Sequence, residues 1–272
     1  SLWKVLLFSL NDYKAFSEIN KLDNKVVNCI DNHGINSENI NKDIKNGVLP
    51  NILLNIDFKT EMQVKVAHFD KFDQITEKSF LKLLESLLLL DFQVLDNCVL
   101  KIFFRRLFNS QKPLFSVAFS REICSKIIEL GVICKDFLFE TLIHAIVMMA
   151  VFEQHPLISQ IMSVTELRFD MIRCILKPEV SWNDKIIDIL LTSIETVDDY
   201  SIYILLVQGM FFRQDLFMNN SRFGKLLVLC IQMMDGNREL KFYVENIVKG
   251  HKSVMEKMIQ MKFKEKMSNF EK

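Results

Sequence analysis

Residues 77–90, which read EKSFLKLLESLLLL, decide the fold class. Their apolar side chains recur at the i, i+3, i+4, i+7 spacing that places residues on one face of an α-helix. The residues on that face are Phe80, Leu83, Leu84 and Leu87. Residues 226–234, LLVLCIQMM, are as apolar. Helices of this kind are typical of stacks in which each helix is covered on two sides.

The same spacing continues along most of the chain, which has 272 residues and only seven glycines and four prolines. We expect residues 1–75 to contain one amphipathic helix over 2–19 and then an Asn/Lys-rich connecting segment. Within that segment, Asn32-His33-Gly34 and Asn46-Gly47 are turn signals. Residues 76–272 are predicted to form a helical-repeat domain. Its expected helices are 77–90, 92–109, 121–130, 136–154, 157–162, 165–176, 182–195, 199–213, 222–234, 238–248 and 254–267.

Several of these helices have capping signals. Ser163 with Glu166, and Ser253 with Glu256, have the spacing of a capping box, in which hydroxyl and carboxylate bind free backbone N–H groups at a helix start. Three glycines stand where a left-handed C-terminal cap is expected. They are Gly131, Gly236 and Gly250.

Paired in sequence, these helices make units of roughly 30 to 40 residues joined by short links. The sequence therefore predicts an all-α fold, an α-solenoid of stacked antiparallel helix pairs. An irregular helical bundle is the alternative, because no strict internal sequence repeat is visible.

Charge and cysteine content limit the classes of partner. The 34 basic and 34 acidic residues cancel, so no long-range field attracts a phosphate backbone, and we expect no direct binding of nucleic acid. The most apolar window, 137–152, contains Glu140 and His144 and is too short to cross a bilayer, so we expect no membrane span. The six scattered cysteines are predicted to be reduced interior thiols.

No catalytic pattern stands out, so we expect no enzyme activity, no metal and no cofactor. Gly224-Lys225 lacks the Ser or Thr and the upstream glycine of a phosphate-binding loop, and the five histidines have no metal-ligand spacing with the cysteines. We interpret His144, inside an apolar helix, as a core residue and not as a general base. The pairs Asp184/Asp188 and Asp198/Asp199 are interpreted as helix-start charges and solvated faces.

Trp182 is expected to be buried at a junction between helix pairs, one residue after the predicted N-cap Ser181. The C-terminal segment 249–272 has seven lysines against three glutamates, an excess of 7 − 3 = +4. Such a face either caps the end of a stack or docks an acidic partner or a duplex.

Four segments resemble the Fanconi anaemia group E family in order, spacing and side-chain class. Glu179-Val-Ser-Trp-Asn-Asp184 and the following IIDILLTSIE resemble the family's Pro-Trp segment, with Ser181 in place of the proline. The other three are residues 155–162 (HPLISQIM), 223–234 (FGKLLVLCIQMM) and 250–259 (GHKSVMEKMI), the last with Val254 where the family has phenylalanine. The resemblance covers about residues 120 to 267.

The resemblance implies a nuclear, non-catalytic adaptor of DNA interstrand-crosslink repair. It would bridge the Fanconi group C and group F subunits and recruit the monoubiquitination substrate, the group D2 protein. The implied partner-binding residues are Val254, Met255, Lys257 and Met258. In one hypothesis Met255 and Lys257 face solvent and contact the partner; in the other, Val254 and Met258 pack inward. An unrelated α-solenoid scaffold of trafficking or the cytoskeleton remains the alternative function.

Overall fold

The computed structural model describes residues 37–50, 53, 72–90, 98–149, 152–194, 199–234 and 238–270. This part of the chain is all-α and contains no strand. Its longer α-helices are α2 (Ser37–Lys45), α5 (Glu77–Leu88), α7 (Cys98–Ser110), α9 (Arg121–Ile133), α12 (His155–Ser163), α13 (Thr165–Leu176), α14 (Asp184–Ile194), α15 (Tyr200–Phe217), α16 (Ser221–Met233), α17 (Arg238–Gly250) and α18 (Glu256–Phe270). Shorter helical segments are α8 (Lys112–Phe115), α10 (Lys135–Leu138), the π-helix η2 (Phe139–Ile143), α11 (His144–Met148) and the 3₁₀ helix η3 (Phe152–Gln154).

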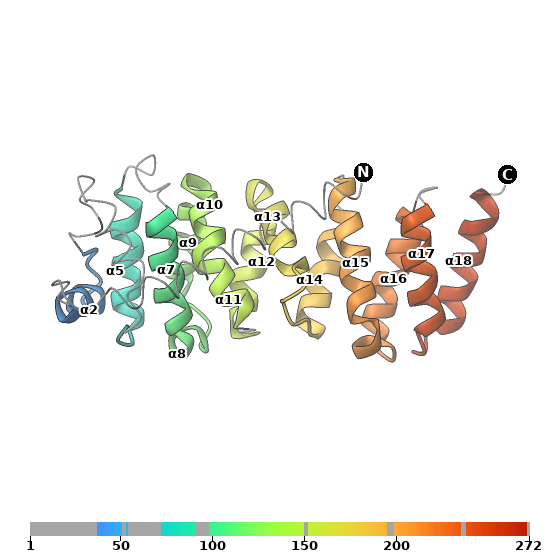
Figure 1. Cartoon of the computed structure of the whole chain (residues 1–272), viewed down its shortest axis with the longest axis horizontal. Coiled ribbons are helices and arrows are strands. Elements are labelled where there is room, and N and C mark those ends of the chain that lie inside the picture. Colours follow the sequence, from blue (N-terminus) through green and yellow to red (C-terminus); the bar gives the residue numbers. More distant parts are fainter. Residues whose placement is uncertain are drawn as a thin grey trace, which may run out of the picture.

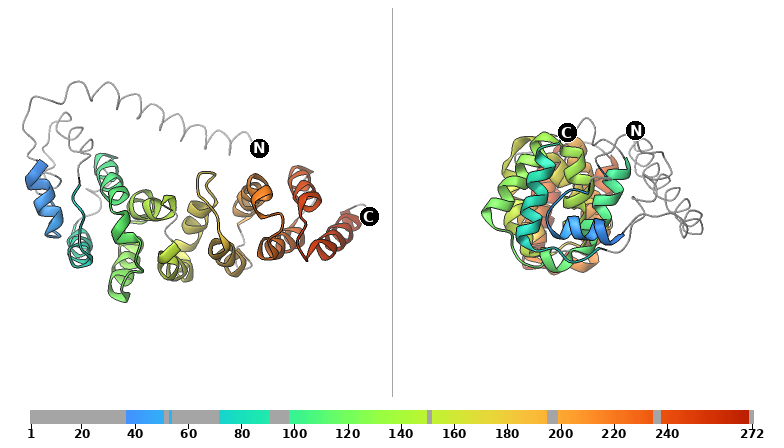
Figure 2. Two further views of the ribbon diagram at one scale, coloured as in Figure 1. Left: turned by 90° about the horizontal axis from the view of Figure 1, so that it is seen from below. Right: turned by 90° about the vertical axis from the view of Figure 1, so that its left-hand side faces the viewer.

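The helices follow one another along the long axis in chain order, from α2 at one end to α18 at the other (Figure 1). Viewed along that axis, they overlap in one compact outline (Figure 2). From α12 onward each helix packs mainly on the helices one or two steps away in the sequence, whereas α5 packs on α9 and α7 packs on η2. In the second half they form two rows, one with α12, α14, α16 and α18 and the other with α13, α15 and α17.

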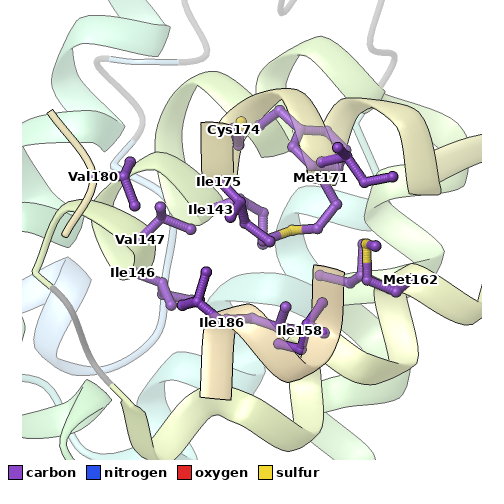
Figure 3. Packing of buried hydrophobic residues seen from close by; sticks show 14 of the residues in the cluster. Ile143, Ile146, Val147, Ile158, Met162, Met171, Cys174, Ile175, Val180 and Ile186 are labelled. Carbon is purple, nitrogen blue, oxygen red and sulfur yellow. The ribbon is translucent and has the colours of Figure 1, made fainter. Parts of the chain in front are cut away.

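One apolar core runs through the stack between the two rows. Figure 3 shows a part of it, where Ile143 of η2, Ile158 of α12, Ile175 of α13 and Ile186 of α14 come together. Ile40 in α2 belongs to the same buried cluster. The core is therefore continuous from the predicted N-terminal segment into the predicted helical-repeat domain.

Three buried polar side chains bind backbone groups about one helix pair upstream. The Gln111 amide accepts from the N–H 36 residues before it and donates to the carbonyl 38 residues before it. The Gln154 amide binds backbone groups 35, 37 and 39 residues upstream. The guanidinium of Arg213 donates to carbonyls 33, 35 and 36 residues upstream. The separations in these three sets of contacts are similar, from 33 to 39 residues.

Trp182 and Arg213 lie together at the junction between α13, α14 and α15. As expected, Trp182 is buried, with 8% of its surface exposed, and its indole Nε1 donates to the Ile175 carbonyl at 3.1 Å. The Arg213 guanidinium carbon lies 4.7 Å from the centre of the Trp182 ring. The predicted cap Ser181 is wrong, because α14 begins at Asp184 and the Asn183 side chain accepts from the Ile186 N–H at 2.9 Å.

The helix predicted over 136–154 is broken. The α10 turn gives way to the π-helix η2, and α11 ends before η3. The Thr141 hydroxyl donates to the Phe137 carbonyl at 2.7 Å within this break. The wider π turn shifts the register of the helix here, and Leu142 and Ile143 are both buried. The helix predicted over 165–176, by contrast, matches α13 in both bounds.

The capping predictions mostly fail. The Ser163 hydroxyl donates to the Gln160 carbonyl, and α13 has no side-chain cap. Ser253 accepts from the Met255 N–H at 3.1 Å and not from that of Glu256. Among the described glycines, only Gly47 has a positive φ, of 74°, at the predicted Asn46-Gly47 turn.

Gly131 and Gly250, which the sequence predicts as left-handed helix caps, have other positions. Gly131 lies inside α9, where a Cβ atom would lie 2.7 Å from Leu138 Cδ2 and 2.9 Å from a Leu167 methyl. It therefore permits close packing between helices. Gly250 is the last residue of α17. Gly236, the 2–19 helix and the Asn32-His33-Gly34 turn lie outside the described residues.

Candidate protein-interaction surface

The terminal helix α18 has an inner face that attaches it to the stack. Met255, Ile259, Phe263 and Met267 recur every four residues, so they share one side of the helix. Ile259 is fully buried, and the other three are half-buried against the core cluster. The helix packs on α16 and α17. Side chains on the opposite side of α18 are exposed.

A short polar turn sets the start of α18. The Lys252 N–H donates to the Met218 carbonyl at 2.7 Å, which anchors the turn to the end of α15. Buried His251 is hydrogen-bonded through Nε2 to the Ser253 hydroxyl at 2.6 Å and stacks on Phe223. Burial lowers the pKa of His251, so it is neutral at pH 7. A rigid turn thus positions the first residues of the helix.

The outer face of α18 combines apolar and basic side chains. Val254 is 95% exposed, and Met258 and Met261 are also exposed. Lys257, Met258, Met261 and Lys264 follow the helical spacing and lie on one side of the helix, and Val254 is in the turn just before it. We call these five residues the outer face of α18.

The lysines of this helix differ in their contacts. Lys262 pairs with Glu265 at 3.0 Å, and Lys266 donates to the Gln232 carbonyl at 2.7 Å. Within the described residues, Lys257 and Lys264 make no ion pair or hydrogen bond. Glu265 lies on the same side, four residues from Met261, and is paired with Lys262. The outer face thus presents Lys257, Lys264 and one paired carboxylate beside exposed apolar atoms, which suits an acidic partner with apolar anchors.

The four predicted site residues divide between the two sides of the helix start. Val254, Lys257 and Met258 are exposed, so the hypothesis that Val254 and Met258 pack inward is wrong. The expectation that Met255 faces solvent is wrong as well, because it is half-buried against the core cluster. Sequence reasoning missed Met261 and Lys264. The i+3 and i+7 spacing from Met258 and Lys257 would have found them.

The described residues contain no group of three or more His, Cys, Asp or Glu side chains arranged to hold a metal ion. A pocket of about 260 Å³ lies between α12, the start of α13 and α14, and its lining includes Ser159, Arg168, Thr192 and Ser193. Its lining residues include no His, Cys, Asp or Glu. The pocket thus holds hydroxyls and one guanidinium, but no side chain that acts as a general base near neutral pH.

His144 is partly buried beside Arg105, and Arg105 Nη2 contacts His144 Nε2. Burial first, and then the charges of Arg105 and Lys177, lower the pKa of His144 to about 3. Its imidazole is therefore neutral at pH 7, where it accepts a hydrogen bond from the guanidinium. This agrees with the interpretation of His144 as a core residue with a structural role.

Four of the cysteines fall on described side chains. Cys124, Cys174 and Cys230 are buried and Cys134 is half-buried, all as free thiols. Burial raises the pKa of Cys174 to about 11 and raises that of Cys230 as well. These thiols remain protonated at neutral pH and act as small apolar side chains.

Comparison of the chain with protein-family models, curated proteins and solved structures gave no significant match. Among the described helices, none is long and apolar enough to cross a membrane. The surface described above is thus the basis for a functional interpretation.

Proposed function

We propose that the chain is an α-solenoid of stacked antiparallel helix pairs, of the HEAT-like kind that the Fanconi resemblance implies. The recurring backbone contacts of Gln111, Gln154 and Arg213, each reaching about one helix pair upstream, support this arrangement. In a compact bundle, polar contacts would also join helices far apart in the sequence. In a solenoid each repeat contacts only its neighbours.

We propose further that the protein is a non-catalytic adaptor. By its resemblance to the group E family it would bridge the Fanconi group C and group F subunits and recruit the group D2 protein in nuclear crosslink repair. The observation that carries an adaptor function is the outer face of α18, where exposed Val254, Met258 and Met261 lie beside Lys257 and Lys264.

The apolar and the basic side chains of this face contribute to partner binding in different ways. Methionine has a flexible, polarisable side chain that adapts to different apolar anchors, so Met258 and Met261 supply contact area. The lysines attract an acidic surface and accelerate encounter, an effect that added salt weakens. The core remains intact when a partner binds, since the inner stripe of α18 is on the other side of the helix.

A variant that replaces one basic and one apolar residue of the outer face by glutamate tests the proposal. Lys257→Glu together with Met258→Glu alters only exposed side chains, so we expect the melting temperature to stay within a few degrees of the parent. Binding of the group D2 protein should weaken at least tenfold, which corresponds to ~1.4 kcal/mol. Val132→Glu, which replaces an exposed apolar residue of α9, is the matched control and should bind as the parent does.

Three purified partners separate the two adaptor functions. Binding of group C, group F and group D2 proteins to the parent supports the Fanconi function. If none of them binds, while a partner identified by co-purification depends on Lys257 and Met258, the chain is an unrelated α-solenoid scaffold. If the double variant retains every interaction, the outer face of α18 is not the binding site.

A further inference from the structure

An exposed aromatic patch lies on α15 and α17, within the row of α13, α15 and α17. It consists of Phe212 and Leu216 on α15 and Phe242 on α17, which are 70%, 80% and 59% exposed. Phe212 and Leu216 are four residues apart and therefore share one face of α15. The two helices pack side by side, so their exposed side chains form one surface.

The patch rests on a fixed aromatic base. The Phe211 ring lies 5.0 Å from that of Tyr243, 5.9 Å from that of Phe212 and 6.5 Å from that of Phe242, measured between ring centres. Phe242 and Tyr243 are themselves 5.7 Å apart. Rings held in this way lose little conformational freedom on association, so the surface is already organised for binding.

Charges of both signs lie beside this patch and nearly balance: α15 has one basic and one acidic residue, and α17 has three basic and two acidic ones. The 18 residues of α15 include two charged side chains, and one of them, Arg213, is buried. Asp215 is exposed on α15, and Lys241 lies half-buried on α17. Glu245 and Lys249, also on α17, form an ion pair at 2.8 Å. A partner of one dominant charge therefore finds no complementary field here.

The size of the surface suits a small dimer interface. The length of α15 is about 27 Å at about 1.5 Å per residue, and two neighbouring helices span about 20 Å across. The whole outer face of the two helices thus has an outline on the order of 500 Å² on each copy, and Phe212, Leu216 and Phe242 occupy part of it. Contact over this whole face in both copies would reach about 1,000 Å², the lower bound for a specific interface.

We propose that the aromatic patch is a self-association surface that binds a second copy of this chain. In a two-fold symmetric contact the same apolar surface meets itself, and each residue at the edge faces a different residue of the other copy. An edge with one acidic and one basic group is then self-complementary, with Asp215 of each copy opposite Lys241 of the other. This association is independent of the outer face of α18.

The test is sedimentation equilibrium of the full chain. The parent should sediment at twice the 31.9 kDa of one chain at high concentration and approach one chain on dilution. Phe212→Glu with Leu216→Glu should weaken association at least tenfold and keep the circular dichroism of the parent. Val132→Glu, with an exposed valine on α9, should associate as the parent does. A parent that stays at the mass of one chain at every concentration overturns the proposal.

A charge exchange tests the same interface without touching the aromatic rings. Asp215→Lys should weaken the dimer, because two lysines then face each other across the interface. Adding Lys241→Glu should restore association to within a few-fold of the parent. If the double variant is no stronger than Asp215→Lys alone, the proposed contact is wrong. Both experiments contain only this protein, so their failure leaves the adaptor function unaffected.

Discussion

Arg213→Met tests the junction between α13, α14 and α15 most sharply. The Arg213 side chain is 6% exposed, and its guanidinium donates at 2.7, 3.0 and 2.8 Å to the carbonyls of Lys177, Pro178 and Val180. Methionine has a similar length but no donor. The substitution therefore removes the hydrogen bonds and retains most of the apolar contact of the side chain.

The expected loss follows from those contacts. Three loop carbonyls lose their donor at about 1 kcal/mol each, and the contact with the Trp182 ring adds about 1 kcal/mol. Against this, methionine avoids the cost of burying a charge, because burial itself lowers the pKa of Arg213. We expect a net destabilisation of about 3 kcal/mol, which lowers the melting temperature by about 6 to 12 °C for a domain of this size.

Arg222→Met is the matched control. Arg222 pairs with Asp184 at 2.9 Å and with Asp188 at 3.3 Å, but its side chain is about half exposed. Surface ion pairs of this kind contribute about 0 to 1 kcal/mol each. Urea unfolding followed by circular dichroism measures both variants. If Arg213→Met costs no more than Arg222→Met, the buried junction does not stabilise the stack as described.

Three further predictions concern other parts of the stack. The pKa of His144 is about 3 in the folded state and about 6.5 in the unfolded state, so its contribution to stability is complete above pH 6.5 and is lost as the pH falls toward 3. The free energy of unfolding should drop by about 1 to 2 kcal/mol from pH 7 to pH 5, and His144→Gln should flatten that decline. Gly131→Ala should destabilise the protein by about 1 to 2 kcal/mol, because the new methyl group meets two buried leucines. Gly250→Ala should be neutral or stabilising. Equal effects of the two substitutions in thermal melts would contradict the close packing at Gly131. Trp182→Ala should cost about 3 to 5 kcal/mol, and an unchanged melting temperature would mean that the indole contributes nothing to the junction.

The sequence predicted the features that depend on local periodicity. The α13 helix was placed correctly because its apolar residues follow a regular 3.6-residue repeat between polar ends. Trp182 was expected to be buried because a large aromatic residue next to an apolar helix start gains most from a covered junction. The exposure of Lys257 at the end of the stack follows in the same way from a charged residue in an amphipathic helix.

Other features depend on contacts that no local pattern encodes. The π-helix at 139–143 allows neighbouring residues such as Leu142 and Ile143 to be buried together, whereas the spacing of the apolar residues alone predicts a continuous α-helix. Gly131 matches the pattern of a helix cap, but its role depends on leucines from two other helices. The exposed Phe212 lies in a helix that is apolar on all sides, a pattern that predicts burial. Met255 is different, because its four-residue spacing from Ile259, Phe263 and Met267 is itself a local pattern that indicates the inner side of α18.

The most direct test of the stacked arrangement is amide hydrogen exchange in a full-length variant that has a destabilising core substitution near one end of the stack. Val244 is fully buried in α17, and Val244→Asp places an unpaired carboxyl in that part of the core. If each helix pair depends on its neighbours, protection should fall strongly in α15 to α18, less in α13 and α14, and stay unchanged in α5, α7 and α9. An equal loss of protection in α5 and α17 would contradict the stack and indicate one cooperative bundle.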